Sequence, residues 1–435
     1  MISMKQTLIA ALVCSVGWSN SHGETLSEAV GKLLESHPNI NAGIYNFLAR
    51  KQEVRQARSA SFPKIDFEAG VGLERITDPA ESELTRREYS LSLRQNIFTG
   101  FETKEEIARQ KNRVRTAAYR IQSVSENEVL KGASAFLDVI RRWRLMKLAQ
   151  ENIRAHERLI DQIKLRSESG LDSGVDLDQA LGRLALATST LVAAEINLRD
   201  AETSYIATIG HEPFQLRIPE QPTEAIPKTL KEVIEIAKKE HPLLKSAEED
   251  VRARREQYKV AKGSHYPVLD LELDKRWREN ADGFEGEEDE WQAMLRLRYN
   301  IFNGFTHSAR KQETAFLISE AEQIRNNAHR EVVEGVRLSW MAHESARRRL
   351  PYLEQRVQST KKTADNYRKQ WNIGKRTLLD VLDSEAETLD SRREQINAEY
   401  SQHRAAYRIL NGMGRLVHTL GLKWPSESIF DEAGE

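Results

Sequence analysis

The chain repeats itself at an offset of 204 residues, and this duplication constrains its fold more than any other feature. The segment Asn96–Phe101 (NIFTGF) returns as Asn300–Phe305 (NIFNGF), and His37-Pro38 returns as His241-Pro242. No net insertion separates these landmarks from the other repeated positions. The two halves are therefore expected to share one architecture.

The repeat divides the chain into five segments. We predict a signal peptide at residues 1–23, a first repeat at 24–212, a proline-rich linker at 213–229, a second repeat at 230–415 and a tail at 416–435. The signal follows from Lys5 and the short apolar run after it. The only cysteine, Cys14, lies inside this segment. Val13 precedes it where a lipoprotein signal carries a small residue, so no lipid modification is expected.

Each half reads as helix, strand, strand, long helix, turn, helix. Period-two alternation predicts one β-hairpin per half, at 64–98 and 268–302, with an apolar face and a charged face. Acidic side chains on each first strand and arginines on each second predict cross-strand ion pairs. The long helices run for nearly seventy residues, and Pro351 is expected to kink the second one. Two shorter helices placed end to end match one long helix in length.

The hairpin strands have the length and pattern of transmembrane barrel strands. Nowhere after the signal does the chain offer the ~18 consecutive apolar residues of a membrane-spanning helix, so a membrane span would be a β-barrel. A soluble antiparallel sheet shows the same alternation. Aromatic residues at both strand ends favour the membrane, as in interfacial girdles; they are Phe62, Phe98, Phe101, Tyr266, Phe302, Phe305, Tyr89, Trp277 and Trp291. Four strands cannot close a barrel, so several chains must share one.

The balance of 65 basic and 66 acidic residues gives no electrostatic argument for nucleic-acid binding. The mature chain carries no cysteine, and no nucleophile elbow, HExxH or Walker A motif occurs, so we predict neither an enzyme, a metal site nor a cofactor. His37 and His241 precede prolines and are expected to shape turns.

The chain resembles the TolC family of outer-membrane efflux proteins over essentially its whole mature length. The two NIFxGF junctions, at Gly100 and Gly304, and the stretch Gly374–Asp383 carry the resemblance. It implies a homotrimer in the outer membrane of a Gram-negative bacterium, with a twelve-stranded barrel continuing into a periplasmic coiled-coil tunnel. The implied partners are outer-membrane lipids, a periplasmic adaptor (membrane fusion) protein and an inner-membrane transporter, an ABC ATPase.

The resemblance also implies a gate at the periplasmic end of the tunnel. Asp380 and Asp383 would form carboxylate rings, which favour cations. Arg376 and Asp176 would belong to the network that holds the end closed, and Trp371 stands where the family pattern has tyrosine. A structural alternative stays open, because Thr377 with Asp380 and Ser173 with Asp176 have the spacing of helix capping boxes.

Three functions remain open at this point. The first is the outer-membrane duct of a tripartite export system that secretes a protein such as an adhesin by the type I route. The second is the same duct in a small-molecule drug efflux pump. The third is a soluble periplasmic coiled-coil scaffold, against which the amphipathic strands argue.

Overall fold

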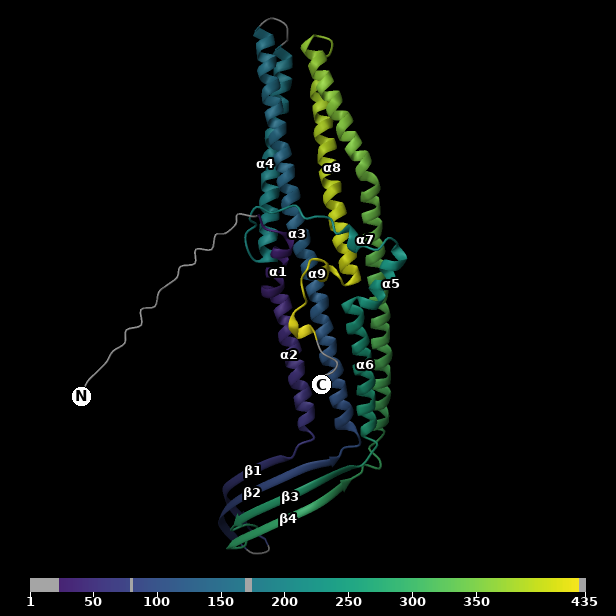
Figure 1. Ribbon diagram of the computed structural model, residues 1–435. Coiled ribbons are helices and arrows are strands. Elements are labelled where there is room, and N and C mark those ends of the chain that lie inside the picture. Colours follow the sequence, from purple (N-terminus) through teal and green to yellow (C-terminus); the bar gives the residue numbers. More distant parts are fainter. Residues whose placement is uncertain (1–22, 79–80, 169–173, 430–435) are drawn as a thin grey trace, which may run out of the picture.

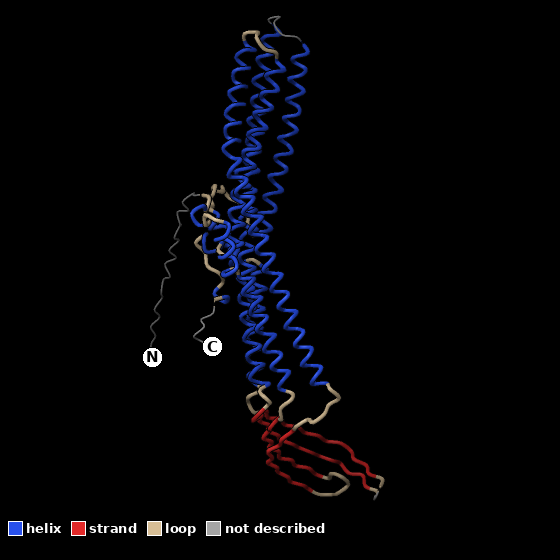
Figure 2. The backbone as a smooth tube through the Cα atoms, turned by 90° about the vertical axis from the view of Figure 1, so that its right-hand side faces the viewer, coloured by secondary structure: helices blue, strands red, loops and turns tan. Residues whose placement is uncertain are grey.

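The computed structural model describes residues 23–78, 81–168 and 174–429. It is a long rod of helices with a β-sheet at one end (Figure 1), and Figure 2 shows the strands confined to that end. The expected signal peptide falls almost entirely outside the described residues. Among those described, no helix combines the length and the apolarity needed to cross a membrane.

The helices confirm the internal duplication. In the first repeat they are α1 (Leu26–Ser36), α2 (Pro38–Ser59), α3 (Glu102–Glu168) and α4 (Gly174–Ile209). In the second repeat they are α5 (Leu230–Glu240), α6 (Pro242–Gly263), α7 (Thr306–Asn372) and α8 (Leu378–Met413). In each repeat the shorter helices are stacked along one long helix (Figure 1). The long helices α3 and α7 have 67 residues each, or ~100 Å at 1.5 Å per residue.

His37 and His241 were expected to shape turns, and each of them divides what the sequence suggested was a single helix before the hairpin into two helices. His37 adopts an extended backbone between α1 and α2, because the residue before a proline is disfavoured in the helical region. Its imidazole Nδ1 accepts the backbone N–H of Asn39, and Pro38 occupies the first turn of α2. His241 caps α6 through Leu243 in the same way. Both histidines therefore join two helices, as caps rather than as loop residues.

The core lies at mid-length, where the rod is thickest. A large buried cluster joins α1, α3, α4, α7 and α8 with the tail helix α9 (Leu416–Thr419). The tail crosses α3 here, so Glu126 of α3 accepts the backbone N–H groups of Leu416 and Val417 and the indole N–H of Trp424. The linker, which includes the short turn Thr223–Ala225, also lies at this level. Helix α7 runs unbroken through Pro351. Its part nearer the tip of the rod leans towards α8 (Figure 1).

Candidate functional site

The four strands form one antiparallel sheet in the order β1-β2-β3-β4. They are β1 (Lys64–Ile76), β2 (Ser82–Phe98), β3 (Val268–Glu279) and β4 (Glu287–Arg298). One face is apolar and is not covered by other parts of the chain: Phe67, Val71 and Leu73 are each about two-thirds exposed or more. A soluble sheet of this kind would cover such a face with its core. The uncovered face instead has the form of a lipid-facing surface.

Aromatic side chains mark both limits of the apolar face. Towards the loops, Tyr89 of β2 lies directly opposite Trp277 of β3, and Trp291 lies on the next strand. At the helix end, Phe98 packs edge-on against Phe101, with 5.2 Å between ring centroids. Two levels of aromatic side chains are the arrangement that anchors barrels at the two membrane interfaces.

The opposite face of the sheet carries the ion pairs predicted from the alternation of charges. Glu272 of β3 receives Arg94 from β2 at 2.8 Å and Arg296 from β4 at 2.7 Å. Nearer the loops, Arg86 pairs with Glu74 at 2.7 Å. Acidic and basic side chains on this face thus neutralise one another in cross-strand pairs, so the face does not carry charge of a single sign.

The strand-to-helix junctions use the left-handed backbone region in both repeats. Gly100 and Phe101 have φ of 63° and 70°, and Gly304 and Phe305 have φ of 65° and 67°. A Cβ on Gly100 would lie 2.5 Å from the carbonyl oxygen of Gly263, whereas one on Gly304 would meet nothing within 4 Å. Glycine at position 100 is therefore needed for close packing as well as for its φ angle.

The far end of the rod carries the candidate gate. Trp371, near the end of α7, is 3% exposed and packs in a cluster with Leu159, Ile163, Leu378 and other apolar residues of both hairpins. The guanidinium of Arg166 lies 4.7 Å from the centre of the Trp371 ring and donates to the carbonyl oxygen of Asn372 at 3.1 Å. Trp371 thus serves as a packing residue of the tip.

Asp380 caps the helix that it begins. Its carboxylate accepts the backbone N–H and the hydroxyl of Thr377, while the Thr377 hydroxyl accepts the backbone N–H of Asp380. These hydrogen bonds from Thr377 lower the pKa of Asp380, and Arg376 at 3.8 Å acts in the same direction. The capping alternative for Asp380 is therefore present in the structure. The Ser173 capping box lies outside the described residues.

Asp383, one turn further along α8, faces the other repeat. It pairs with Arg183 of α4 at 2.9 Å. Sequence reasoning did not single out Arg183 or Arg166, although Arg183 lies seven residues after Asp176 and so shares a face of α4 with it. These two arginines connect the hairpin tips of the two repeats.

Arg376 is held within its own hairpin. Its guanidinium stacks 4.3 Å from the centre of the Tyr367 ring, and its Nε donates to Gln370 at 3.2 Å. Asp176 is half-buried in the first turn of α4, on the other hairpin. No described contact of Arg376 reaches Asp176. Among the described residues there is also no group of three or more histidine, cysteine, aspartate or glutamate side chains that could hold a metal ion.

The apolar sheet, the helical rod and the charged tip together define a channel component of the outer membrane. The family model for the outer membrane efflux protein matches residues 29–211 and 233–415, and the chain belongs to this family. It is a non-enzymatic transport protein that extends from the outer membrane into the periplasm.

Relatives and solved structures agree with this assignment. The chain is 22% identical to the outer membrane efflux protein BepC of Brucella suis, over 92% of this chain and 88% of BepC. It is 24% identical to the outer membrane protein TolC of Vibrio cholerae, over 95% and 96% of the two chains. A crystal structure of CusC superposes with a TM-score of 0.80 at 13% identity, covering 89% of this chain and 91% of that one. This last likeness concerns the fold.

Proposed function

We propose that three copies of this chain form the outer-membrane duct of a tripartite export system that secretes a protein, such as an adhesin, by the type I route. The observation that carries the proposal is the sheet, whose lipid-type face ends at two open edges, β1 and β4. Open edges are not tolerated in lipid, so the strands of partner subunits must complete the barrel. Each chain brings four strands, and a homotrimer brings twelve.

The duct has no energy source of its own. It therefore needs a powered inner-membrane transporter, an ABC ATPase, and a periplasmic adaptor that joins this transporter to the duct. A polar groove of about 550 Å³ between α3, α7 and α8 supports adaptor docking near the tip. Arg158, Lys361, Glu385 and Arg392 contribute both signs of charge to its lining. Mixed charges at a groove set the register of a partner and speed its approach.

The tip supports a gate whose closure depends on both repeats. Asp383 and Arg183 link α8 to α4, while Asp380 and Arg376 stay within the second hairpin. In a trimer the aspartates would recur around the axis as rings of carboxylates, which favour cations over anions. Opening would require the Arg183–Asp383 hydrogen bond to break.

The choice of protein secretion over drug efflux rests on the expectation that this chain carries no lipid-modified cysteine. That expectation comes from Val13, which stands before Cys14 where a lipoprotein signal carries a small residue.

The secreted and surface proteins of a strain lacking the gene, compared with its parent, test the cargo class. Loss of one or a few large exported proteins, restored by the gene on a plasmid, is the expected result. An unchanged set of exported proteins with accumulation of toxic small molecules in the mutant would replace type I secretion with drug efflux.

A further inference from the structure

Each hairpin of the sheet leaves the helical rod at one point and returns to it at another, and we call these two points the base of the hairpin. In the first repeat, hydrogen bonds join the end of β2 to the end of α2. The side-chain amide of Asn96 donates to the carbonyl oxygen of Ala60 at 3.2 Å, and that of Gln95 donates to the carbonyl oxygen of Ser61 at 3.1 Å. These bonds hold the base of the first hairpin closed.

The second repeat does not use these bonds. At the offset of 204 the corresponding side chains are Asn300 and Tyr299, and no hydrogen bond in the described part of the chain joins them to the end of α6. Strand β4 also ends earlier in its repeat, at Arg298, whereas β2 continues to Phe98. The base of the second hairpin therefore lacks the closure that the first repeat has.

Two histidines face one another at the base of the second hairpin. His265 lies between the end of α6 and the start of β3, and His307 lies in the first turn of α7. The centroids of the two imidazole rings are 5.6 Å apart. In the described part of the chain, neither ring takes part in a hydrogen bond or an ion pair. The first repeat has Ser61 and Thr103 at these positions, so the histidine pair belongs to the second repeat alone.

The separation of the two rings suits imidazoles that share one metal ion. With a metal–nitrogen bond of ~2.1 Å, two rings on one ion have their centroids between about 4.5 and 6.5 Å apart. Imidazole is a ligand for zinc, copper and nickel, and among the divalent first-row ions Cu²⁺ binds a given set of nitrogen ligands most tightly. Two nitrogens leave the other coordination positions to water, so such a site needs no third protein ligand.

We propose that His265 and His307 bind one divalent metal ion, Cu²⁺ most tightly, and that this ion closes the base of the second hairpin. The ion ties the end of α6 to the start of α7, where the first repeat uses the side-chain amides of Asn96 and Gln95. The whole hairpin separates the two histidines in the sequence, so no spacing motif marks them. The site lies within one chain and goes beyond the proposed export function.

Equilibrium dialysis of the full chain, purified without a histidine tag, tests the site with Cu²⁺, Zn²⁺ and Mg²⁺. One Cu²⁺ per chain is expected; Zn²⁺ should compete for it more weakly, and Mg²⁺ should not compete because it prefers oxygen ligands. His265→Ser combined with His307→Thr installs the residues of the first repeat and should abolish this binding. Each single substitution should weaken it at least tenfold, since even the loss of an outer-shell partner costs about 10- to 100-fold.

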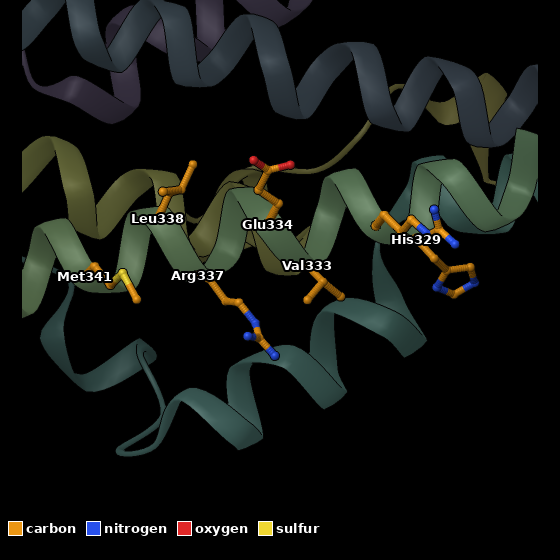
Figure 3. A pocket seen from close by; sticks show the side chains of 7 residues that line it. His329, Val333, Glu334, Arg337, Leu338 and Met341 are labelled. Atoms are coloured by element: carbon orange, nitrogen blue, oxygen red, sulfur yellow. The ribbon is translucent and has the colours of Figure 1, made fainter.

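His329 provides the matched control, because it lies on the same helix without a second histidine beside it. It lines an open pocket of about 640 Å³ on α7, together with Val333, Leu338, Met341 and three charged residues that include Arg330 (Figure 3). None of the other described residues that line this pocket is a histidine. His329→Thr should therefore leave the binding of Cu²⁺ unchanged, and an equal loss in this variant would overturn the assignment of the site.

Electron paramagnetic resonance of the bound Cu²⁺ identifies its ligands, because nitrogen nuclei split the copper signal. Splitting from two nitrogens is expected in the native chain, and splitting from one nitrogen in each single variant that still binds. Circular dichroism checks that every variant is folded. The same copper signal in the native chain and in the folded double variant would overturn the site.

Hydrogen exchange tests whether the ion closes the hairpin base. The amides of residues 299–305 should exchange several-fold more slowly with Zn²⁺ than with EDTA, whereas the corresponding amides of residues 95–101 should be unaffected. In the double variant Zn²⁺ should change neither segment. Metal binding in the native chain without slower exchange at residues 299–305 would overturn the closing role of the ion.

Discussion

The long helices α3 and α7 have equal length and corresponding sequence positions, yet they occupy different environments. α3 has helices of both repeats around it, and residues such as Val129, Phe136 and Leu137 are fully buried. α7 has α6 and α8 on one side and leaves apolar side chains such as Phe316 and Met341 exposed on the other. One repeat pattern thus has two uses. On α3 it builds the core of the chain, and on α7 it leaves an apolar surface for the subunit contacts of the proposed homotrimer.

The C-terminal tail contacts α3 and so adds a second difference between the two long helices. It covers α3 at mid-length, where Glu126 receives three N–H donors, while the corresponding residue on α7 is Arg330 in the open pocket. The duplication thus gives α3 and α7 similar surfaces. The residues that differ between the two helices, such as Glu126 and Arg330, distinguish the surface that the tail covers from the one that it leaves open.

The largest effect is expected when a charge is placed at the corresponding positions Val129 and Val333. Val129→Asp buries an unpaired carboxylate in the core and should destabilise the folded chain by more than about 4 kcal/mol. Val333→Asp should leave the chain folded and dissociate the oligomer. Circular dichroism with urea measures the first, and light scattering in detergent measures the second. Val333→Ala is the control. Equal loss of fold in both aspartate variants would remove the distinction between the two helices.

The second prediction concerns the buried acid of α3. Glu126 is 1% exposed, and this burial raises its pKa to about 7. The folded state therefore holds the proton more tightly than the unfolded state does. Stability from this group is fully present below pH ~4.5 and is lost as pH rises through 7, with a span of about 3 kcal/mol. The tail should loosen from α3 as the pH rises.

Hydrogen exchange at the amides of Leu416 and Val417 measures this loosening. After correction for intrinsic rates, their protection should fall between pH 5 and pH 8 in the native chain. In Glu126→Gln the protection should be independent of pH, and Arg330→Gln should behave as the native chain. The same slope in Glu126→Gln as in the native chain would contradict this assignment.

The sequence was sufficient for what depends on local pattern and duplication. Period-two alternation placed the strands, and the repeated NIFxGF segments placed both junctions with their glycines. The proline after His37 indicated a turn, because a proline inside a helix breaks it. It did not reveal that a second helix begins directly at Pro38, in whose first turn a proline is tolerated.

Contacts between distant segments could not be predicted from the sequence, because no local pattern encodes them. The burial of Glu126 depends on a tail almost 300 residues away, and the pairing of Asp383 with Arg183 depends on how two hairpins are placed side by side. At the tip, the capping spacing of Thr377 and Asp380 was readable because it is local. Its role in a gate stays a prediction.

The smallest effects are expected at the tip, where the side chains are partly exposed and ion pairs contribute little to stability. These effects are best measured as conductance in planar bilayers. Two variants compare a contact between the repeats with a contact inside one repeat. Arg183→Gln removes the bond between α4 and α8, so it should raise the resting conductance. Arg376→Gln should raise it less, because the described partners of Arg376 lie in its own hairpin.

Asp380→Asn combined with Asp383→Asn should lower cation selectivity several-fold, since both carboxylate rings of the proposed trimer would lose their charge. Asp390→Asn is the control, because Asp390 pairs with Arg393 of the same helix further from the tip. Unchanged selectivity would leave Asp380 with its capping role alone. A larger conductance change in Arg376→Gln than in Arg183→Gln would mean that closure depends on the shape of the second hairpin rather than on the bridge between repeats.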